Sequence, residues 1–107
     1  MIYELRIYEV VPGKLPALNE RFSKITMGYF KKYGLKIVGL WTDEVGINNR
    51  LIYMLAFDDM AHREKAWAAL RADPDRAKAF AETEKDGPLV ICVTNTIMVP
   101  TAYSPMQ

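Results

Sequence analysis

The alternation of large apolar side chains along the chain predicts four β-strands. They cover residues 2–11, 35–44, 50–57 and 89–99. The first strand is followed by the turn dipeptide Pro12-Gly13, and the last ends before Pro100. The segment between the second and third strands is rich in glycine and asparagine, which favours a hairpin.

Between the first two strands, the large residues follow the spacing of an amphipathic helix. The successive intervals are 3, 4, 3, 4 and 4 along the stripe Leu15, Leu18, Phe22, Ile25, Tyr29 and Tyr33. Pro16 suits the first helical turn, and Gly34 can end the helix as a left-handed cap. Gly28 is either a tolerated defect, costing about 1 kcal/mol against alanine, or a site of close packing against the sheet.

The stretch between the last two strands predicts helical structure that is broken once. Asp58 or Asp59 can cap a helix that ends near Arg71. Asp73-Pro74 then restarts the helix, with aspartate as the cap and proline in the first turn. The residues expected to face inward are Met60, Arg63, Trp67 and Leu70, followed by Ala77, Phe80 and Ala81.

The resulting order, β-α-β-β-α-β, predicts a ferredoxin-like α+β fold. In this fold a four-stranded antiparallel sheet carries its helices on one face. A chain of 107 residues has room for one hydrophobic core, so we expect residues 1–107 to form a single domain.

Both faces of this sheet are too apolar for either one to lie in water. Along residues 50–57 one face presents Leu51, Tyr53, Leu55 and Phe57, and the other presents Ile52, Met54 and Ala56. A patch of this size exceeds what a monomer normally leaves exposed. We therefore expect a homodimer joined through the open sheet face, which would bury roughly 2,000 Å² or more. A monomer with a large ligand-filled groove is the alternative.

Composition and charge indicate which classes of partner, and which cellular location, are to be expected. Lys and Arg together number 14 and Asp and Glu 13, and this balance argues against a nucleic-acid partner. The longest apolar stretch, residues 51–57, is far shorter than the ~18 residues that cross a bilayer, so no membrane span is expected. Glu4 and Arg6 interrupt the region where a signal peptide needs an apolar run, so we expect a cytoplasmic protein.

Metal and cysteine chemistry is not expected. Cys92 is the single cysteine and cannot form an internal disulfide, and its mid-strand position predicts a buried, inert thiol. No cluster of histidine, cysteine and carboxylate residues has the spacing of metal ligands, and no glycine-rich loop is built to hold phosphate. We therefore expect neither a metal site nor a cofactor.

Three polar residues share one face of the first strand: Glu4, Arg6 and Tyr8. Successive members lie about 6.5–7 Å apart along a strand. If this face points into a chamber formed by the dimer, a carboxylate, a guanidinium and a phenol can orient a small acidic or enolisable ligand. The alternative is an internal ion pair with a satisfied phenol, which would fix the strand register or the dimer interface.

Aromatic residues and the sole histidine add further candidates. Trp41, Tyr53 and Phe57 supply aromatic surface either for a ligand pocket or for the core. His62 falls in the first turn of a predicted helix. It can act as a general base, as an axial haem ligand, or simply as a capping or solvent-facing residue.

Arg63 lies on the inward stripe of the same helix and needs a counter-charge there. Glu44 or Asp58 can supply it, in a structural or a ligand-anchoring role.

Several short motifs, taken in order, resemble the NIPSNAP family. They are Tyr3-Glu4-Leu5-Arg6-x-Tyr8, Pro12-Gly13-Lys14, Gly39-x-Trp41-x-x-Glu44-x-Gly46-x-x-Asn49, Asp58 with Ala61-His62-Arg63-Glu64, and Pro100-Thr101-x-x-Ser104-Pro105. The resemblance runs from residue 3 to 105 and is weakest across 71–90. It implies a single NIPSNAP-like domain with a dimeric α/β-barrel fold. The wider fold group includes antibiotic-biosynthesis monooxygenases, haem-degrading enzymes and muconolactone isomerases, but the resemblance implies no particular activity.

Two functional hypotheses remain, and whether the protein is an enzyme stays open. In the first, a NIPSNAP-like homodimer binds a small molecule or a protein partner without catalysis, and its ligand-binding residues are Arg6, Tyr8, Trp41, Tyr53 and Arg63. In the second, it is a cofactor-independent oxygenase or isomerase acting on a small enolisable or aromatic compound. Arg6 would then bind an oxyanion, and the proton would be carried by Tyr8, Glu4 or His62.

Overall fold

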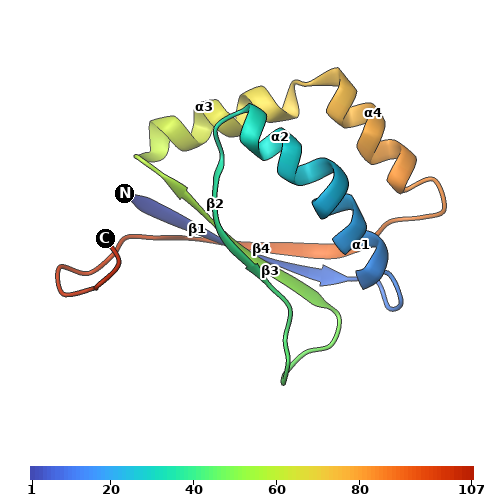
Figure 1. Cartoon of the computed structure of the whole chain (residues 1–107), viewed down its shortest axis with the longest axis horizontal. Coiled ribbons are helices and arrows are strands. Elements are labelled where there is room, and N and C mark those ends of the chain that lie inside the picture. The colour runs from blue at the N-terminus through green and yellow to red at the C-terminus, as the bar shows by residue number, and fades with distance from the viewer.

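A computed structural model describes residues 1–107 and shows a four-stranded antiparallel sheet with its helices on one face (Figure 1). The strands are β1 (Ile2–Val10), β2 (Lys36–Trp41), β3 (Arg50–Phe57) and β4 (Val90–Met98). Their order across the sheet is β2-β3-β1-β4, so β1 and β3 are central. The shortest dimension of the Cα trace is 19 Å, which fits one sheet and one helical layer. The predicted ferredoxin-like α+β class is confirmed.

Two helical stretches form the second layer. Their segments are α1 (Leu15–Arg21), the π-helical η1 (Phe22–Thr26), α2 (Met27–Lys32), α3 (Met60–Arg71) and α4 (Pro74–Thr83). Asp59 caps α3 and Asp73 caps α4, each by accepting backbone N–H groups of the first turn. Gly34 has a φ of +75° and follows α2, as predicted for a left-handed cap. None of the helices combines the length and the apolar character that a membrane-spanning segment needs.

The π-turn changes which residues of the first helical stretch face the sheet. The buried ones are Leu18, Arg21, Phe22, Thr26 and Phe30. Positions four apart drift by about 40° in a regular α-helix, and the wider π-turn absorbs this drift. The predicted stripe is therefore wrong at Ile25, which does not pack against the core, whereas Tyr29 and Tyr33 are half-buried and do pack against it.

The inward face of α4 also differs from the prediction. Ala77 and Ala81 are exposed, whereas Arg76, Phe80 and Thr83 are partly buried. The guanidinium carbon of Arg76 lies 4.3 Å from the centroid of the Phe80 ring, so the arginine packs along the aromatic face. Met60, the first residue of α3, is likewise exposed rather than inward-facing.

The hydrophobic core lies between the sheet and the helices. Tyr53, Phe22, Phe30 and Trp67 form an aromatic group at its centre, with the Phe22 and Tyr53 ring centroids 5.2 Å apart. Gly28 does not contribute to this packing, because a Cβ there would meet no atom within 4 Å. Its role in close packing against the sheet is therefore excluded.

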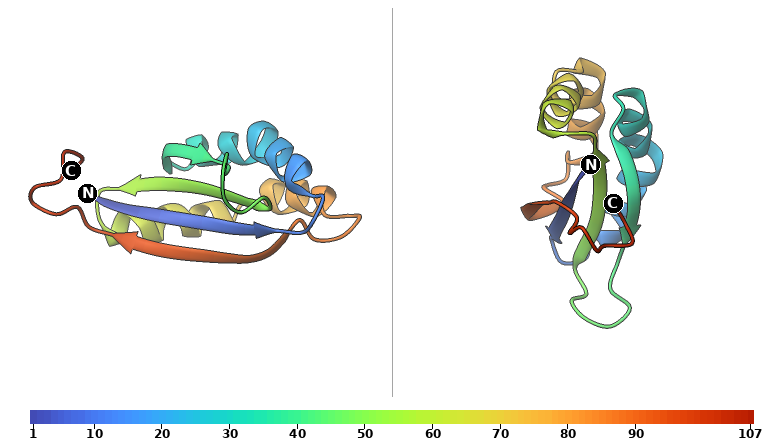
Figure 2. Two further views of the ribbon diagram at one scale, coloured as in Figure 1. Left: turned by 90° about the horizontal axis from the view of Figure 1, so that it is seen from below. Right: turned by 90° about the vertical axis from the view of Figure 1, so that its left-hand side faces the viewer.

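The opposite face of the sheet has no helical cover (Figure 2, left). Leu5, Ile52 and Met54 alternate with core residues and are half-exposed on this face. Cys92 is exposed, with its Sγ 3.1 Å from a carboxylate oxygen of Glu9. Its predicted burial is wrong for the single chain, because β4 is an edge strand and this face is uncovered.

Candidate functional site

The carboxylate of Glu4 is the centre of a buried hydrogen-bond network on the helix-facing side of β1. The residue has 0% of its surface exposed. Arg63 donates from Nε and Nη2 at 3.0 Å each, and Trp67 donates from Nε1 at 2.9 Å. Asn95 Nδ2 donates at 3.0 Å and Arg6 Nη1 at 3.2 Å. The network therefore links α3 to both β1 and β4.

These donors keep the Glu4 carboxylate charged. Burial by itself raises the pKa of Glu4, but the hydrogen bonds from Arg63 and Trp67 and the charge of Arg6 outweigh it. The pKa of Glu4 consequently lies below its ordinary value of 4.5.

The buried counter-charge of Arg63 is therefore Glu4. Arg63 also forms an ion pair with Glu64, in which Nη1 lies 2.6 Å from Oε1. The predicted partners, Glu44 and Asp58, are wrong. Sequence spacing could not find the correct partner, because Glu4 meets Arg63 only when α3 folds back over β1.

Arg6 uses all three of its nitrogens within the protein. Besides Glu4, it donates from Nε to the Tyr53 hydroxyl at 2.6 Å and from Nη2 to the Tyr8 hydroxyl at 3.4 Å. The two hydroxyls lie 2.9 Å apart. Burial and the neighbouring Tyr8 raise the pKa of Tyr53, which stays protonated. When Tyr53 donates to Tyr8, the proton of Tyr8 is left free for another acceptor.

The structure thus brings together five of the predicted site residues: Glu4, Arg6, Tyr8, Tyr53 and Arg63. They face the helices, however, and not the open face through which the dimer is expected to form. The premise that Glu4, Arg6 and Tyr8 point into a chamber between two sheets is therefore wrong. The internal ion pair and the satisfied phenol of the alternative interpretation are both present.

The remaining predicted residues lie apart from this network. Trp41 is on the open face, where its indole lies across Gly39, and it is 49% exposed. His62 accepts the backbone N–H of Asp58 at Nδ1, 3.0 Å away, and its ring lies 5.3 Å from the fully buried Phe57 ring. These are the contacts of a helix-capping histidine. The predicted roles of Trp41 in ligand binding and of His62 in catalysis or haem ligation stay predictions.

A small, partly enclosed cavity adjoins Tyr8 between the two layers. Its volume is about 30 Å³. It is lined by Tyr8, Arg21, Phe22, Thr26, Tyr29, Phe30, Trp67, Leu70, Arg76 and Phe80. Three buried polar atoms on these residues have no hydrogen-bond partner: Arg21 Nε, Thr26 Oγ1 and Arg76 Nε. Because buried polar groups in proteins are nearly always paired, these atoms identify the cavity as the candidate binding site.

None of these three residues was predicted from the sequence. Arg21 and Thr26 are not members of the predicted apolar stripe, and Thr26 lies buried within the π-turn. Arg76 precedes the alanine that the pattern placed inside. The intervals of four between Phe22, Thr26 and Phe30 fit one face of an ordinary α-helix and gave no distinct signal of a polar site.

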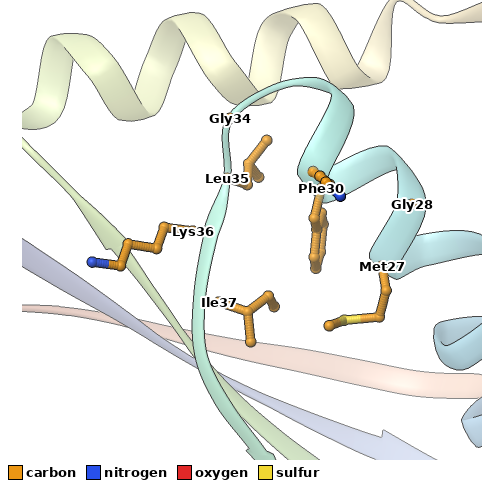
Figure 3. Close-up of a pocket in the computed structure, with 8 residues that line it drawn as sticks. Met27, Gly28, Phe30, Gly34, Leu35, Lys36 and Ile37 are labelled. Atoms are coloured by element: carbon orange, nitrogen blue, oxygen red, sulfur yellow. The ribbon is translucent and has the colours of Figure 1, made fainter.

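A larger depression lies on the surface between α2 and the edge strand β2 (Figure 3). Its volume is about 590 Å³. The side chains of Met27, Phe30, Leu35 and Ile37 lie toward one another there, whereas the ammonium of Lys36 points away. The depression is open to solvent and holds no unpaired buried donor, so it offers less to orient a ligand than the smaller cavity.

This combination of a ferredoxin-like sheet, one helix-covered face and a polar cavity between the layers places the protein among ferredoxin-like α+β proteins. A monooxygenase from Streptomyces coelicolor, solved in complex with Nanaomycin D, has this fold with a TM-score of 0.63 at 10% identity, over 96% of this chain and 89% of that chain. This likeness concerns the fold alone.

The family follows from the sequence: the NIPSNAP family model matches residues 3–105, and the chain belongs to the NIPSNAP family. A NIPSNAP family protein with unknown function from Agrobacterium tumefaciens is 30% identical, with a TM-score of 0.86 over 100% of this chain and 94% of that chain. An uncharacterised NIPSNAP domain protein from Burkholderia xenovorans is 27% identical, with a TM-score of 0.85 over 98% of this chain and 99% of that chain. No curated protein sequence matches this chain.

Proposed function

We propose that this NIPSNAP family protein is a homodimer that binds a small organic molecule in the cavity beside Tyr8. The observation that carries the binding function is the set of unpaired, buried polar atoms on residues that line the cavity. Leaving such a group unsatisfied costs about 1–3 kcal/mol, and a ligand that pairs with it recovers this energy. The aromatic rings of Phe22, Phe30 and Phe80 supply apolar contact around the polar atoms.

The cavity is too small to hold a whole ligand, since it accommodates only a group of a few atoms. Tyr29, however, also borders a surface depression of about 480 Å³ between α2 and α4. This depression is lined by Lys24, Ile25, Gly28, Tyr29, Lys32 and Ala79. A molecule with a compact polar head in the cavity and a larger body in the depression fits this arrangement.

The binding function can be tested by NMR titration of the purified protein with a panel of fragment-sized aromatic compounds, both neutral and anionic. We expect at least one compound to shift the Trp67 indole N–H resonance saturably, because Trp67 lines the cavity. Gly28→Leu should abolish the shift by filling the depression, since a Cβ at Gly28 points into open space. Ala68→Leu, on the exposed side of α3, is the matched control. A panel without any binder would contradict the proposal.

The enzymatic hypothesis retains one supporting observation. The hydrogen-bonded chain from Arg6 through Tyr53 ends at Tyr8, which lines the cavity. Tyr8 could there exchange a proton with an enolisable ligand, as an isomerase requires. In this version Arg6 positions the two phenols and does not bind an oxyanion, because its nitrogens already have protein partners. Loss of proton exchange between a bound ligand and water in Tyr8→Phe, with binding retained, would support this second candidate.

The homodimer is supported by the uncovered face of the sheet. Only 20 of 107 residues are buried in the single chain. The open face presents Leu5, Ile52 and Met54 at its centre and Trp41 at its edge. A second copy that places its own open face against this one would cover all of these residues in one symmetric interface.

Sedimentation velocity at micromolar concentration tests the dimer. We expect a species of twice the 12.2 kDa chain mass. Met54→Glu puts a charge at the centre of the open face and should yield a folded monomer. Ala69→Glu, on the exposed side of α3, should remain dimeric. A folded wild-type monomer would exclude the dimer while leaving the cavity and its chemistry intact.

A further inference from the structure

The charged residues around the cavity indicate the chemical class of the group that binds there. Resting on the proposed binding function, we infer that the group held in the cavity is the carboxylate of a small organic acid, bound between Arg21 and Arg76. These arginines are the only charged side chains in the cavity wall. Their guanidinium carbons lie 4.8 and 4.3 Å from the centroid of the same ring, Phe80, so both positive charges lie next to this one cavity-lining ring.

The protein supplies a counter-charge for only one of the two cations. Glu84 accepts a hydrogen bond from Arg21 Nη1 at 2.9 Å. No carboxylate lies within ion-pair distance of Arg76, and Asp73 already accepts hydrogen bonds from two backbone N–H groups, Lys32 and Tyr33. Burial, together with the charges of Arg21 and Arg71, lowers the pKa of Arg76. A partly buried cation without a partner is costly, and an anion in the cavity would remove that cost.

The number and type of the free donors favour a carboxylate over other anions. Arg21 Nε and Arg76 Nε come from α1 and α4, Thr26 Oγ1 comes from η1, and Tyr8 can donate from the sheet. A carboxylate has two oxygens with about four acceptor positions, enough for all of these donors. Arginine also matches the planar shape of a carboxylate. A cavity of about 30 Å³ accommodates this group, and the rest of the acid would lie past Tyr29 in the depression.

Benzoate and benzamide provide a matched pair of probes, since they share size and planarity and differ in charge. Titrations at constant ionic strength, followed at the Trp67 indole N–H, should show benzoate binding roughly tenfold or more tightly. Arg76→Gln should lose this preference and leave benzamide binding nearly unchanged. Arg71→Gln is the control, because Arg71 is exposed, carries the same charge near Trp67 and does not line the cavity.

The stability of the unliganded protein gives an independent readout. Arg76→Gln removes an uncompensated charge. Without ligand, the variant protein should therefore have a thermal unfolding midpoint at or above that of the wild type. Benzoate should raise the midpoint of wild type and not that of Arg76→Gln. An unliganded Arg76→Gln midpoint below wild type would assign Arg76 a structural role and overturn the inference.

The possible titration results separate this inference from the proposed function. Equal affinity for benzoate and benzamide, or unchanged benzoate binding in Arg76→Gln, would overturn the carboxylate site while small-molecule binding stands. Failure of both probes, with no other binder in the wider panel, would overturn both.

Discussion

At the scale of single residues, the charged side chains of Glu4 and Arg76 differ in how fully they are hydrogen-bonded. Both carry charge into the layer between sheet and helices. Glu4 receives hydrogen bonds from four side chains, whereas the Arg76 side chain has none. A buried charge with full hydrogen bonding stabilises the fold, whereas a half-buried charge without protein partners leaves its hydrogen-bonding capacity open to a ligand. On this contrast rests the proposal that the cluster around Glu4 belongs to the framework and the one around Arg76 to the binding site.

Removing the charge of Glu4 should therefore destabilise the fold. Glu4→Gln leaves Arg6 and Arg63 without their shared carboxylate, and breaking a buried pair of this kind costs roughly 3–5 kcal/mol. Urea denaturation at neutral pH measures the loss. Glu64→Gln removes the exposed partner of the same Arg63 and should change the free energy of unfolding by less than about 1 kcal/mol. Equal effects of the two substitutions would contradict the central role of Glu4.

The same carboxylate predicts a pH dependence of stability. The pKa of Glu4 is lower in the folded protein than its ordinary value of 4.5, so the unfolded chain takes up the proton first as the pH falls. The contribution of Glu4 is complete above pH 4.5 and is lost progressively below it. Unfolding curves of wild type and Glu4→Gln should therefore converge between pH 4.5 and the acid limit of folding. A difference that stays constant over this range would show that the charge of Glu4 is not involved.

At the scale of elements, apolar periodicity and capping residues predicted most of the fold. The third strand was expected at 50–57 and is observed there, and Asp73-Pro74 begins α4 as expected. The candidate site was not predictable in the same way. Thr26 is buried and Arg76 half-buried at positions that the apolar pattern does not single out, because their burial depends on tertiary packing. Arg6 and Tyr8 were predicted to share a face by strand alternation, whereas the register that brings Tyr53 opposite Arg6 became visible only in the structure.

The π-turn itself leads to a deletion experiment. The inward residues Leu18, Phe22, Thr26 and Phe30 are spaced by four, which an α-helix carries about 120° around its axis over this span. Removing the exposed Ser23 changes the intervals to 4, 3 and 4, which a regular α-helix keeps on one face. We expect the deletion variant to fold, with a helical circular dichroism signal at least equal to wild type.

The matched control for this deletion is loss of Ala68, which is exposed within the regular helix α3. That deletion rotates Leu70 away from the core by about 100° and should prevent cooperative unfolding. If the Ser23 deletion is as damaging as the Ala68 deletion, the π-turn does not have the compensating role described.

At the scale of the whole molecule, the proposed binding and the proposed dimer use opposite faces of the sheet. The helix-covered face holds both the Glu4 network and the cavity. The proposed dimer uses the other face. Ligand binding and association are therefore expected to be independent, unlike in a protein whose site lies between subunits. A monomeric Met54→Glu variant should bind benzoate with nearly wild-type affinity, measured by the same titration. Loss of binding on dissociation would mean that the two faces are coupled.

Cys92 reports directly on whether the open face is covered, because it is exposed there in the single chain and is the only thiol. A thiol within an interface reacts only when the interface opens. With an aromatic disulfide reagent, wild-type Cys92 should react at least tenfold more slowly than Cys92 in Met54→Glu, and faster as the protein is diluted. The hydrogen bond to Glu9 raises the pKa of the thiol and slows both reactions, so it does not account for a difference between them. Equal rates in the two proteins, at a concentration where wild type sediments as a dimer, would place the interface elsewhere than on this face.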